Sequence, residues 1–269
     1  LDDNGDGVAN APADGQLATE RLFACEVAPP QENWPPHITQ AEVRNLTAQQ
    51  GDVWADAQDD HQELKWMWAV VYPPSWRPAS PGEKMVATPK SISLQAKATG
   101  GYETTYIWPE IGLYRLVIHA NDKADLLARP KEIEVSIGGP SLKPGDDLTI
   151  DIPIGNLDTT VEVPGQAVTA TTTFVYTPTT RAPDITPPDY TFAGRSFEIV
   201  AYQWGEPQPG FTFERPITIT VHYSDADVVE LDESTLALWQ RNGGAWSQEG
   251  LTLTHRLTAT NELIVRAAH

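Results

Sequence analysis

Alternation of polar and apolar side chains most constrains what this chain can fold into, and residues 111–130 show it best: IGLYRLVIHANDKADLLARP. Tyr114, Leu116 and Ile118 recur at every second position, the period of a β-strand with one face in a packed core. A glycine precedes the run and an Asn/Asp-rich loop follows it, and both signals bound strands. The same pattern recurs along the chain, so we expect an all-β protein built of tandem β-sandwich domains.

Frequent turn residues agree with that fold class. The 269 residues include 23 prolines and 19 glycines, which favours many short strands over long helices. This length predicts about two domains, each able to bury its own core. We expect an acidic loop and proline-rich linker at 1–37, an immunoglobulin-like sandwich at 38–139 and a second sandwich at 140–269. The boundary falls at the GGP tripeptide of residues 138–140, which cannot continue a strand.

Seven short strands over about 100 residues are what an immunoglobulin- or fibronectin-like sandwich requires. Trp66 and Trp68 lie on the third of them, where such folds place a core tryptophan. The seven predicted strands of the first domain are 38–46, 52–57, 65–72, 91–98, 103–108, 114–120 and 132–137.

The second domain shows the same alternation with more prolines. Asn242-Gly243-Gly244 predicts a tight turn, and residues 232–234 predict a single helical turn. A further strand would usually follow residues 263–269, so we expect an open sheet edge beside them. The predicted strands are 148–152, 159–163, 167–177, 191–202, 217–223, 235–240, 245–248, 251–257 and 262–266.

The formal net charge of −19 excludes some partners. Such an acidic surface repels nucleic acid and anionic membranes, and suits divalent cations, a basic partner or solubility alone. No apolar run reaches the ~18–20 residues that span a bilayer. The chain opens at Leu1, so we expect an interior piece of a longer precursor, located outside the cell or on its surface.

No residue pattern in the chain predicts catalysis. Cys25 is the one cysteine, which excludes an internal disulfide, and it has neither a histidine partner motif nor a nucleophile elbow. The six histidines match no metal-binding motif, and His119 and His222 are expected to be ordinary sheet residues. The chain is therefore expected not to be an enzyme.

Residues 1–7 begin like a calcium loop. Asp2, Asn4 and Asp6 alternate before Gly7, so their oxygens are spaced as in the first half of an EF-hand loop. The position of the bidentate glutamate is occupied by Ala13, and no helical pattern flanks the segment. A looser calcium loop and a solvated turn remain as alternatives.

A second acidic group is predicted at one end of the first sandwich. Asp59 and Asp60 lie between the second and third strands, and Asp122 and Asp125 lie between the sixth and seventh. These two connections share one end of an immunoglobulin-like sandwich, where clustered carboxylates would repel each other unless Ca²⁺ or solvent screened them. We expect a calcium site there, with solvated loops as the alternative. A similar, weaker group consists of Asp225, Asp227, Glu230 and Asp232.

Several stretches resemble a known family. LDDNGDGVANAPADG, WAVVYPPSW and GLYRLVIHANDKADLLARPKEIEV resemble the region after the peptidase domain in bacterial secreted proteins with a legumain/caspase-like cysteine peptidase. AVTATTTFVYTP, FAGRSFEIVAY and GFTFERPITITVHYSDADV resemble a second β module of the sandwich type found in ankyrins and netrin receptors. The resemblance implies that a peptidase domain precedes Leu1 in the precursor. The family's catalytic His-Gly and Asp-Ala-Cys motifs are absent, so no catalytic residue is carried over.

Three functions follow from these patterns. The first is a structural or adhesive extracellular protein that assembles with its own copies through open strand edges. The second is an accessory region that holds substrate for, or anchors, a secreted peptidase. The third is a carbohydrate-binding module that uses exposed tryptophans, with Trp34, Trp76, Trp108 and Trp204 as candidates.

Overall fold

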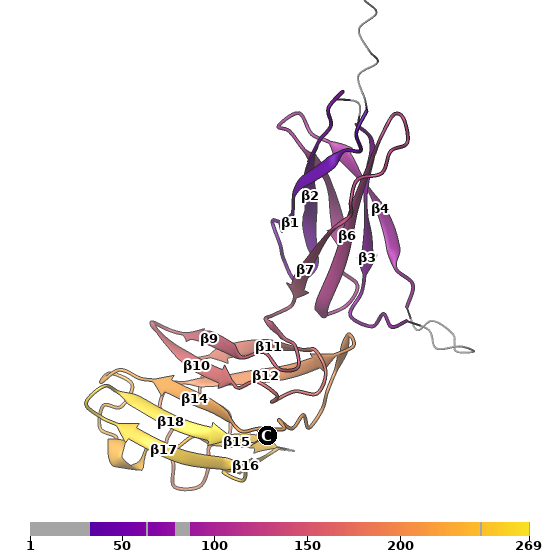
Figure 1. Ribbon diagram of the computed structural model, residues 1–269. Coiled ribbons are helices and arrows are strands. Elements are labelled where there is room, and N and C mark those ends of the chain that lie inside the picture. Colours follow the sequence, from indigo (N-terminus) through magenta and orange to yellow (C-terminus); the bar gives the residue numbers. More distant parts are fainter. Residues whose placement is uncertain (1–32, 63, 79–86, 243, 269) are drawn as a thin grey trace, which may run out of the picture. The chain divides into compact units, whose positions relative to one another are not determined.

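The computed structural model describes residues 33–62, 64–78, 87–242 and 244–268. Residues 35–269 form one compact unit. The described part is nearly all β, as predicted, and antiparallel pairing joins its strands into several sheets (Figure 1). Asp2, Asn4, Asp6 and Cys25 lie outside the described residues. No helix within the described ranges is long and apolar enough to cross a membrane.

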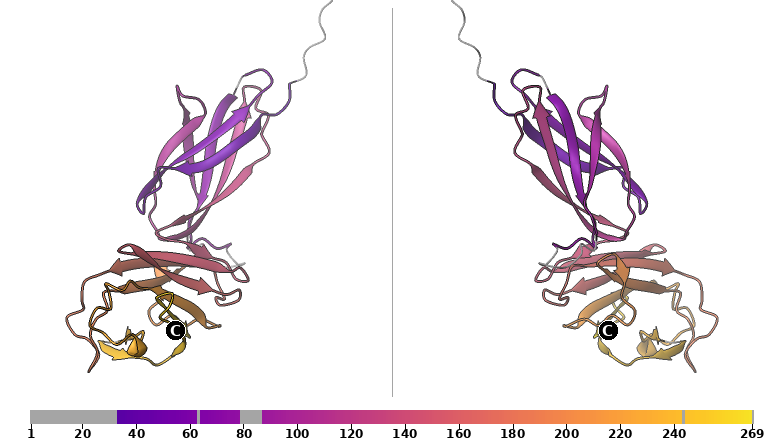
Figure 2. Two further views of the ribbon diagram at one scale, coloured as in Figure 1. Left: turned by 90° about the vertical axis from the view of Figure 1, so that its left-hand side faces the viewer. Right: turned by 90° about the vertical axis from the view of Figure 1, so that its right-hand side faces the viewer.

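The first sandwich has the seven predicted strands, each within a few residues of its predicted bounds. They pair in the order β1-β2-β5-β4-β3-β6-β7, which places the first, second and fifth strands together and the third, sixth and seventh together, as in immunoglobulin-like domains. Figure 2 shows these strands from two further sides. The strands are β1 His37–Arg44, β2 Gln50–Gln58, β3 Leu64–Tyr72, β4 Lys90–Ala96, β5 Tyr102–Ile107, β6 Gly112–Asp122 and β7 Lys131–Ile137.

β4 joins the two groups of strands. Its first part pairs with β3 through Met67↔Leu94, and its last two residues pair with β5 through Gln95↔Glu103. At the opposite ends of the strand order, Lys131 of β7 donates to the Thr39 carbonyl of β1 at 2.6 Å. The edges β1 and β7 therefore contact each other.

The first core is built around β6. Tyr114, Leu116 and Ile118 are fully buried there, which confirms the alternation from which the fold was predicted. The expectation of a core tryptophan on β3 is wrong, because Met67 points inward and Trp66 is 60% exposed. Trp108 takes that place and packs on the Tyr114 ring at 4.9 Å between centroids.

The second sandwich consists of two sheets, ordered β17-β18-β14-β10-β9 and β13-β12-β11-β8, with a separate β15-β16 hairpin. Its core has Phe174 at its centre and is separate from the first core. The strands are β8 Ser141–Leu142, β9 Leu148–Ile154, β10 Leu157–Val163, β11 Thr172–Thr179, β12 Ser196–Gln203, β13 Glu206–Pro207, β14 Ile217–His222, β15 Gln240–Asn242, β16 Ala245–Ser247, β17 Leu251–Leu257 and β18 Glu262–Ala267. A 3-10 turn, η1 Glu233–Thr235, lies before β15.

The structure corrects four predictions for this domain. The open edge expected beside residues 263–269 is wrong, because β18 pairs with β14 on one side and with β17 on the other. The strands predicted at 167–177 and 191–202 begin only at Thr172 and Ser196, and the one predicted at 235–240 is mostly η1 and loop. β8 and β13 have two residues each, too few to show an alternation.

The segment between the domains packs closely against β11. The Phe174 N–H donates to the Pro140 carbonyl at 2.9 Å. A Cβ on Gly139 would lie 2.0 Å from the Phe174 carbonyl oxygen, so only glycine permits this approach. The GGP boundary of the sequence is therefore a packed junction.

Candidate functional site

The predicted acidic end of the first sandwich brings its two connections together. Leu64 pairs with Asp122 where β3 begins and β6 ends. Lys65 then binds the Asp125 carboxylate at 2.8 Å. The β2–β3 and β6–β7 connections therefore lie at the same end, and a lysine is placed between them.

The carboxylates at this end have protein partners. Asp122 is 1% exposed and accepts from the Leu126 N–H at 2.8 Å, which closes the β6–β7 loop. Asp125, at a φ of 64°, also accepts from the side chain of Asn121 at 3.1 Å. Asp60 pairs with His61 at 2.8 Å. These contacts hold loops in place and do not direct the carboxylates at one common point.

No group of three or more His, Cys, Asp or Glu side chains in the described ranges is placed to hold a metal ion. A hollow of about 480 Å³ does lie at this end, but Asp59 is its one predicted ligand. Two nearby carboxylates, Asp122 and Asp125, do not line it. Calcium binding therefore stays a prediction.

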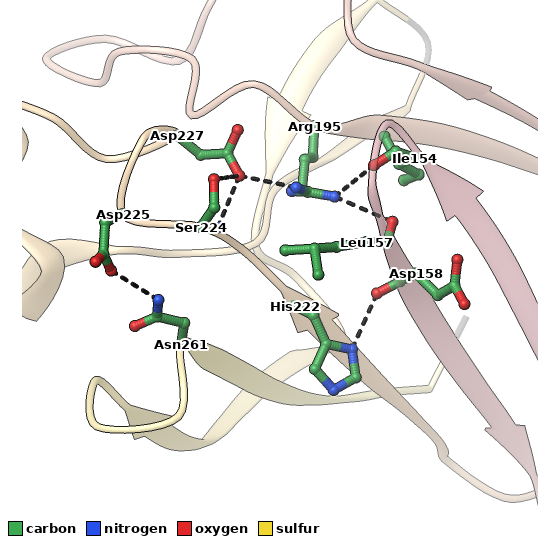
Figure 3. A network of polar contacts seen from close by, with 9 residues as sticks. All are labelled: Ile154, Leu157, Asp158, Arg195, His222, Ser224, Asp225, Asp227 and Asn261. Atoms are coloured by element: carbon green, nitrogen blue, oxygen red, sulfur yellow. Dashed lines mark hydrogen bonds and ion pairs between the residues drawn. The ribbon is translucent and has the colours of Figure 1, made fainter.

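A network of polar contacts in the second sandwich centres on Arg195 (Figure 3). Its guanidinium donates to the carbonyls of Ile154 and Leu157, at 2.6 and 3.2 Å, on either side of the β9–β10 turn. It also binds the Asp227 carboxylate at 2.8 Å, and its side chain is only 8% exposed. Arg195, directly before β12, thus ties the start of that strand to the β9–β10 hairpin and to the loop after β14.

The carboxylate of Asp227 accepts hydrogen bonds from both Arg195 and Ser224. Burial raises the pKa of its carboxyl, but hydrogen bonds from Arg195 and Ser224 outweigh burial and hold the pKa below its ordinary value. Asp225 accepts instead from Asn261 at 2.8 Å, as Figure 3 shows. Asp232 caps η1 by accepting from the Ser234 N–H. The predicted acidic group is therefore divided among separate structural roles.

Both histidines expected to be sheet residues have partners on neighbouring strands. His119 stacks on Trp68 across β6 and β3, with ring centroids 5.1 Å apart. Burial lowers the pKa of His119. His222 contacts the Asp158 carbonyl at 2.9 Å through Nδ1 and lies 3.5 Å from the Glu262 carboxylate through Nε2.

Most edge strands of the second sandwich are short or interrupted. β8 and β13 have two residues each, and β9 carries Pro153, which has no N–H to offer a further strand. β17 is different, because it has seven residues and pairs on one side with β18 (Figure 1). Every residue from Thr252 to Leu257 is exposed. It contains one bulge, between Leu253 and His255.

The candidate tryptophans lie in different surroundings. Trp108 is 5% exposed and belongs to the core, so its selection as a binding residue was wrong. Trp34 is 64% exposed. Trp76 and Trp204, 128 residues apart in the chain, line the same hollow of about 210 Å³.

Arg195 and Arg115 were not singled out from the sequence. A lone arginine before a strand, or one in an alternating strand, has no local pattern that marks it as special. Comparison with models of protein families and with curated proteins finds no match for this chain.

Proposed function

We propose that this chain is a non-catalytic, extracellular β-sandwich protein with a structural or adhesive role, whose copies associate through the edge of β17. The observation that carries the proposal is the difference between β17 and the other edges of its domain. A long strand with unpaired backbone groups is a template for another strand, whereas two-residue strands and a proline-bearing edge are not.

Charge supports a second copy of this chain as the partner. β17 carries His255 and Arg256 and no acidic residue, in a chain with a net charge of −19. An edge of this kind is attracted to the acidic surface that every other copy presents. Leu253 and Leu257, 41% and 40% exposed, add apolar area that pairing would bury.

The test is the oligomeric state of the chain, measured by size-exclusion chromatography with light scattering over a range of concentrations. We expect association that weakens in the double variant Leu253→Glu/Leu257→Glu, because it removes apolar area and adds negative charge at the edge. Ile107→Glu is the matched control, since Ile107 is 72% exposed at the end of β5, which belongs to a different sheet from β17. A strictly monomeric chain at every concentration would overturn the proposal, as would equal weakening by Ile107→Glu.

Calcium stabilisation rests on the sequence alone. Melting curves in EDTA and in excess calcium test it, since an ion that binds only the folded state raises the melting temperature. An unchanged midpoint would remove calcium from the proposed function and leave β17 association untouched. Attachment to a secreted peptidase likewise stays a prediction from the resemblance.

A further inference from the structure

We propose that the hollow shared by Trp76 and Trp204 binds an acidic saccharide, with Arg115 holding the carboxylate of a uronic acid unit. This site is independent of association through β17. It is bordered by aromatic side chains from both sandwiches, with Tyr72 and Trp76 from the first and Tyr202 and Trp204 from the second. Aromatic surfaces combined with a few placed polar groups are the usual make-up of small-ligand sites.

The aromatic walls are held in place by the backbone. Trp76 follows a turn in which its N–H donates to the Pro73 carbonyl at 2.9 Å, and its ring meets Tyr72 edge to face at 4.7 Å. Trp204 lies in the two-residue turn between β12 and β13, with a φ of 56°. Arg77 stacks over the Trp204 ring at 3.8 Å. Fixed rings of this kind lose little conformational freedom when the apolar face of a sugar ring stacks on them.

Polar groups line the same hollow in a fixed row. Tyr72, Arg115 and Glu134 are cross-strand neighbours on β3, β6 and β7, and all three line it. Lys143 of the second sandwich donates to the Glu134 carboxylate. These groups are placed to bind the hydroxyls around a sugar ring.

Arg115 is the reason to expect an acidic sugar. Its guanidinium stacks over Tyr72 at 4.6 Å, and its nearest carboxylate, Glu132, lies at 4.0 Å, the limit of an ion pair. Its Nε is buried and has no hydrogen-bond partner. The Arg115 side chain as a whole is 43% exposed, so its terminal nitrogens can meet a carboxylate, which accepts two parallel hydrogen bonds from arginine.

The experiment is calorimetric titration of the whole chain with three probes: an oligogalacturonate, the matched neutral galactan oligosaccharide, and a proline-rich peptide. The peptide is included because aromatic grooves also bind polyproline segments. The buffer contains about 0.15 M salt, which screens the long-range repulsion between an acidic protein and an anionic ligand. We expect the oligogalacturonate to bind and the other two to bind at least about tenfold more weakly, the loss expected without the charge-assisted hydrogen bond.

Four variants test whether the side chains of the hollow carry the binding. Arg115→Gln and Trp204→Ala are each expected to weaken oligogalacturonate binding at least about tenfold. Arg241→Gln and Trp66→Ala are the matched controls, because these side chains do not line the hollow and Trp66 is 60% exposed, and they are expected to leave binding unchanged. Thermal melting establishes that each variant is folded. Arg115→Lys replaces Arg115→Gln if the latter unfolds, since it keeps the positive charge and loses the planar pair of terminal donors.

The proposal is overturned if none of the probes binds, if the neutral oligosaccharide binds as tightly as the acidic one, or if the peptide alone binds. Unchanged binding in the folded Arg115 variant would also overturn it.

Discussion

The hydroxyl of Tyr114 makes two hydrogen bonds to the backbone of Glu110, four residues earlier in the chain. It accepts from the Glu110 N–H at 2.9 Å and donates to the Glu110 carbonyl at 3.1 Å. In immunoglobulin-like sandwiches a tyrosine near the start of the sixth strand ties down the preceding corner in the same way. The Glu110 carboxylate in turn accepts from the N–H and the hydroxyl of Ser75, at 3.0 and 2.7 Å. This corner therefore also fixes the turn that carries Trp76.

Removal of the Tyr114 hydroxyl is expected to destabilise the first sandwich. Tyr114→Phe leaves the Glu110 N–H and carbonyl without their partner, which should lower the free energy of unfolding by about 1–3 kcal/mol. Urea denaturation measures the change. Tyr106→Phe is the control, because Tyr106 is also buried but its hydroxyl makes no hydrogen bond with the described residues. Equal effects of the two substitutions would contradict the role of the corner.

Arg195 is expected to be critical for the second sandwich. Arg195→Met leaves Asp227 without its cationic partner, and because the Asp227 side chain is 23% exposed, we expect a loss of about 2–3 kcal/mol, below that of a fully buried pair. Asp227→Asn keeps an acceptor for the guanidinium and should cost about 1 kcal/mol. Urea denaturation of both variants measures the two losses in the free energy of unfolding. A smaller loss in Arg195→Met than in Asp227→Asn would show that the guanidinium does not hold the network.

The junction between the domains is expected to tolerate no side chain at residue 139. The Cβ of Gly139→Ala would meet the Phe174 carbonyl oxygen, a backbone atom that cannot rotate away, so we expect a loss of about 3 kcal/mol. Gly145→Ala is the control, because a Cβ there meets open space and only its φ of 96° is unfavourable, at about 1 kcal/mol. Thermal melting of the two variants tests this prediction. Similar melting temperatures would argue against the close approach of residue 139 to the Phe174 carbonyl.

His119 is expected to make stability depend on pH. Because burial lowers the pKa of His119 from its ordinary 6.5, the unfolded chain binds a proton below pH 6.5 that the folded chain does not. The free energy of unfolding should therefore fall as the pH drops below about 6.5, until the folded-state pKa is reached. His119→Phe keeps a ring against Trp68 and cannot titrate, so its difference from the wild type should change with pH. A flat difference between pH 7.5 and pH 5 would contradict the prediction.

Strand positions in the first sandwich were predictable because the information is local. The period-two pattern around Tyr114, bounded by Gly112 and by an Asn/Asp-rich loop, lies within about ten residues of sequence. It was harder to predict which face of each strand points into the core. On β3 both Trp68 and Met67 are apolar, so alternation alone does not say which set points inward. Packing decided it: Met67 belongs to the buried core that contains Trp108, whereas Trp66 is 60% exposed and Trp68 is half-buried.

Strand pairing and binding surfaces were not predictable in this way. The interior place of β18 depends on β14 and β17 both pairing with it, and β14 lies about 40 residues earlier in the chain. The hollow with Trp76 and Trp204 likewise depends on segments that are 128 residues apart in the chain. The acidic loops at residues 59–60 and 122–125 were correctly expected at one end, because immunoglobulin-like connectivity determines which loops are neighbours. Their individual contacts, such as Lys65 with Asp125, follow from side-chain packing.

The sequence by itself determined that this chain is a β protein and where most of its strands lie. Each of these properties follows from side-chain period and turn chemistry over a few neighbouring residues. Tertiary structure decided which tryptophan enters the core, that β17 rather than β18 is an edge, and that Arg115 lies in an aromatic hollow. Those outcomes depend on burial and pairing between distant segments. Their free energies therefore depend on the arrangement of the whole chain and not on any short stretch of it.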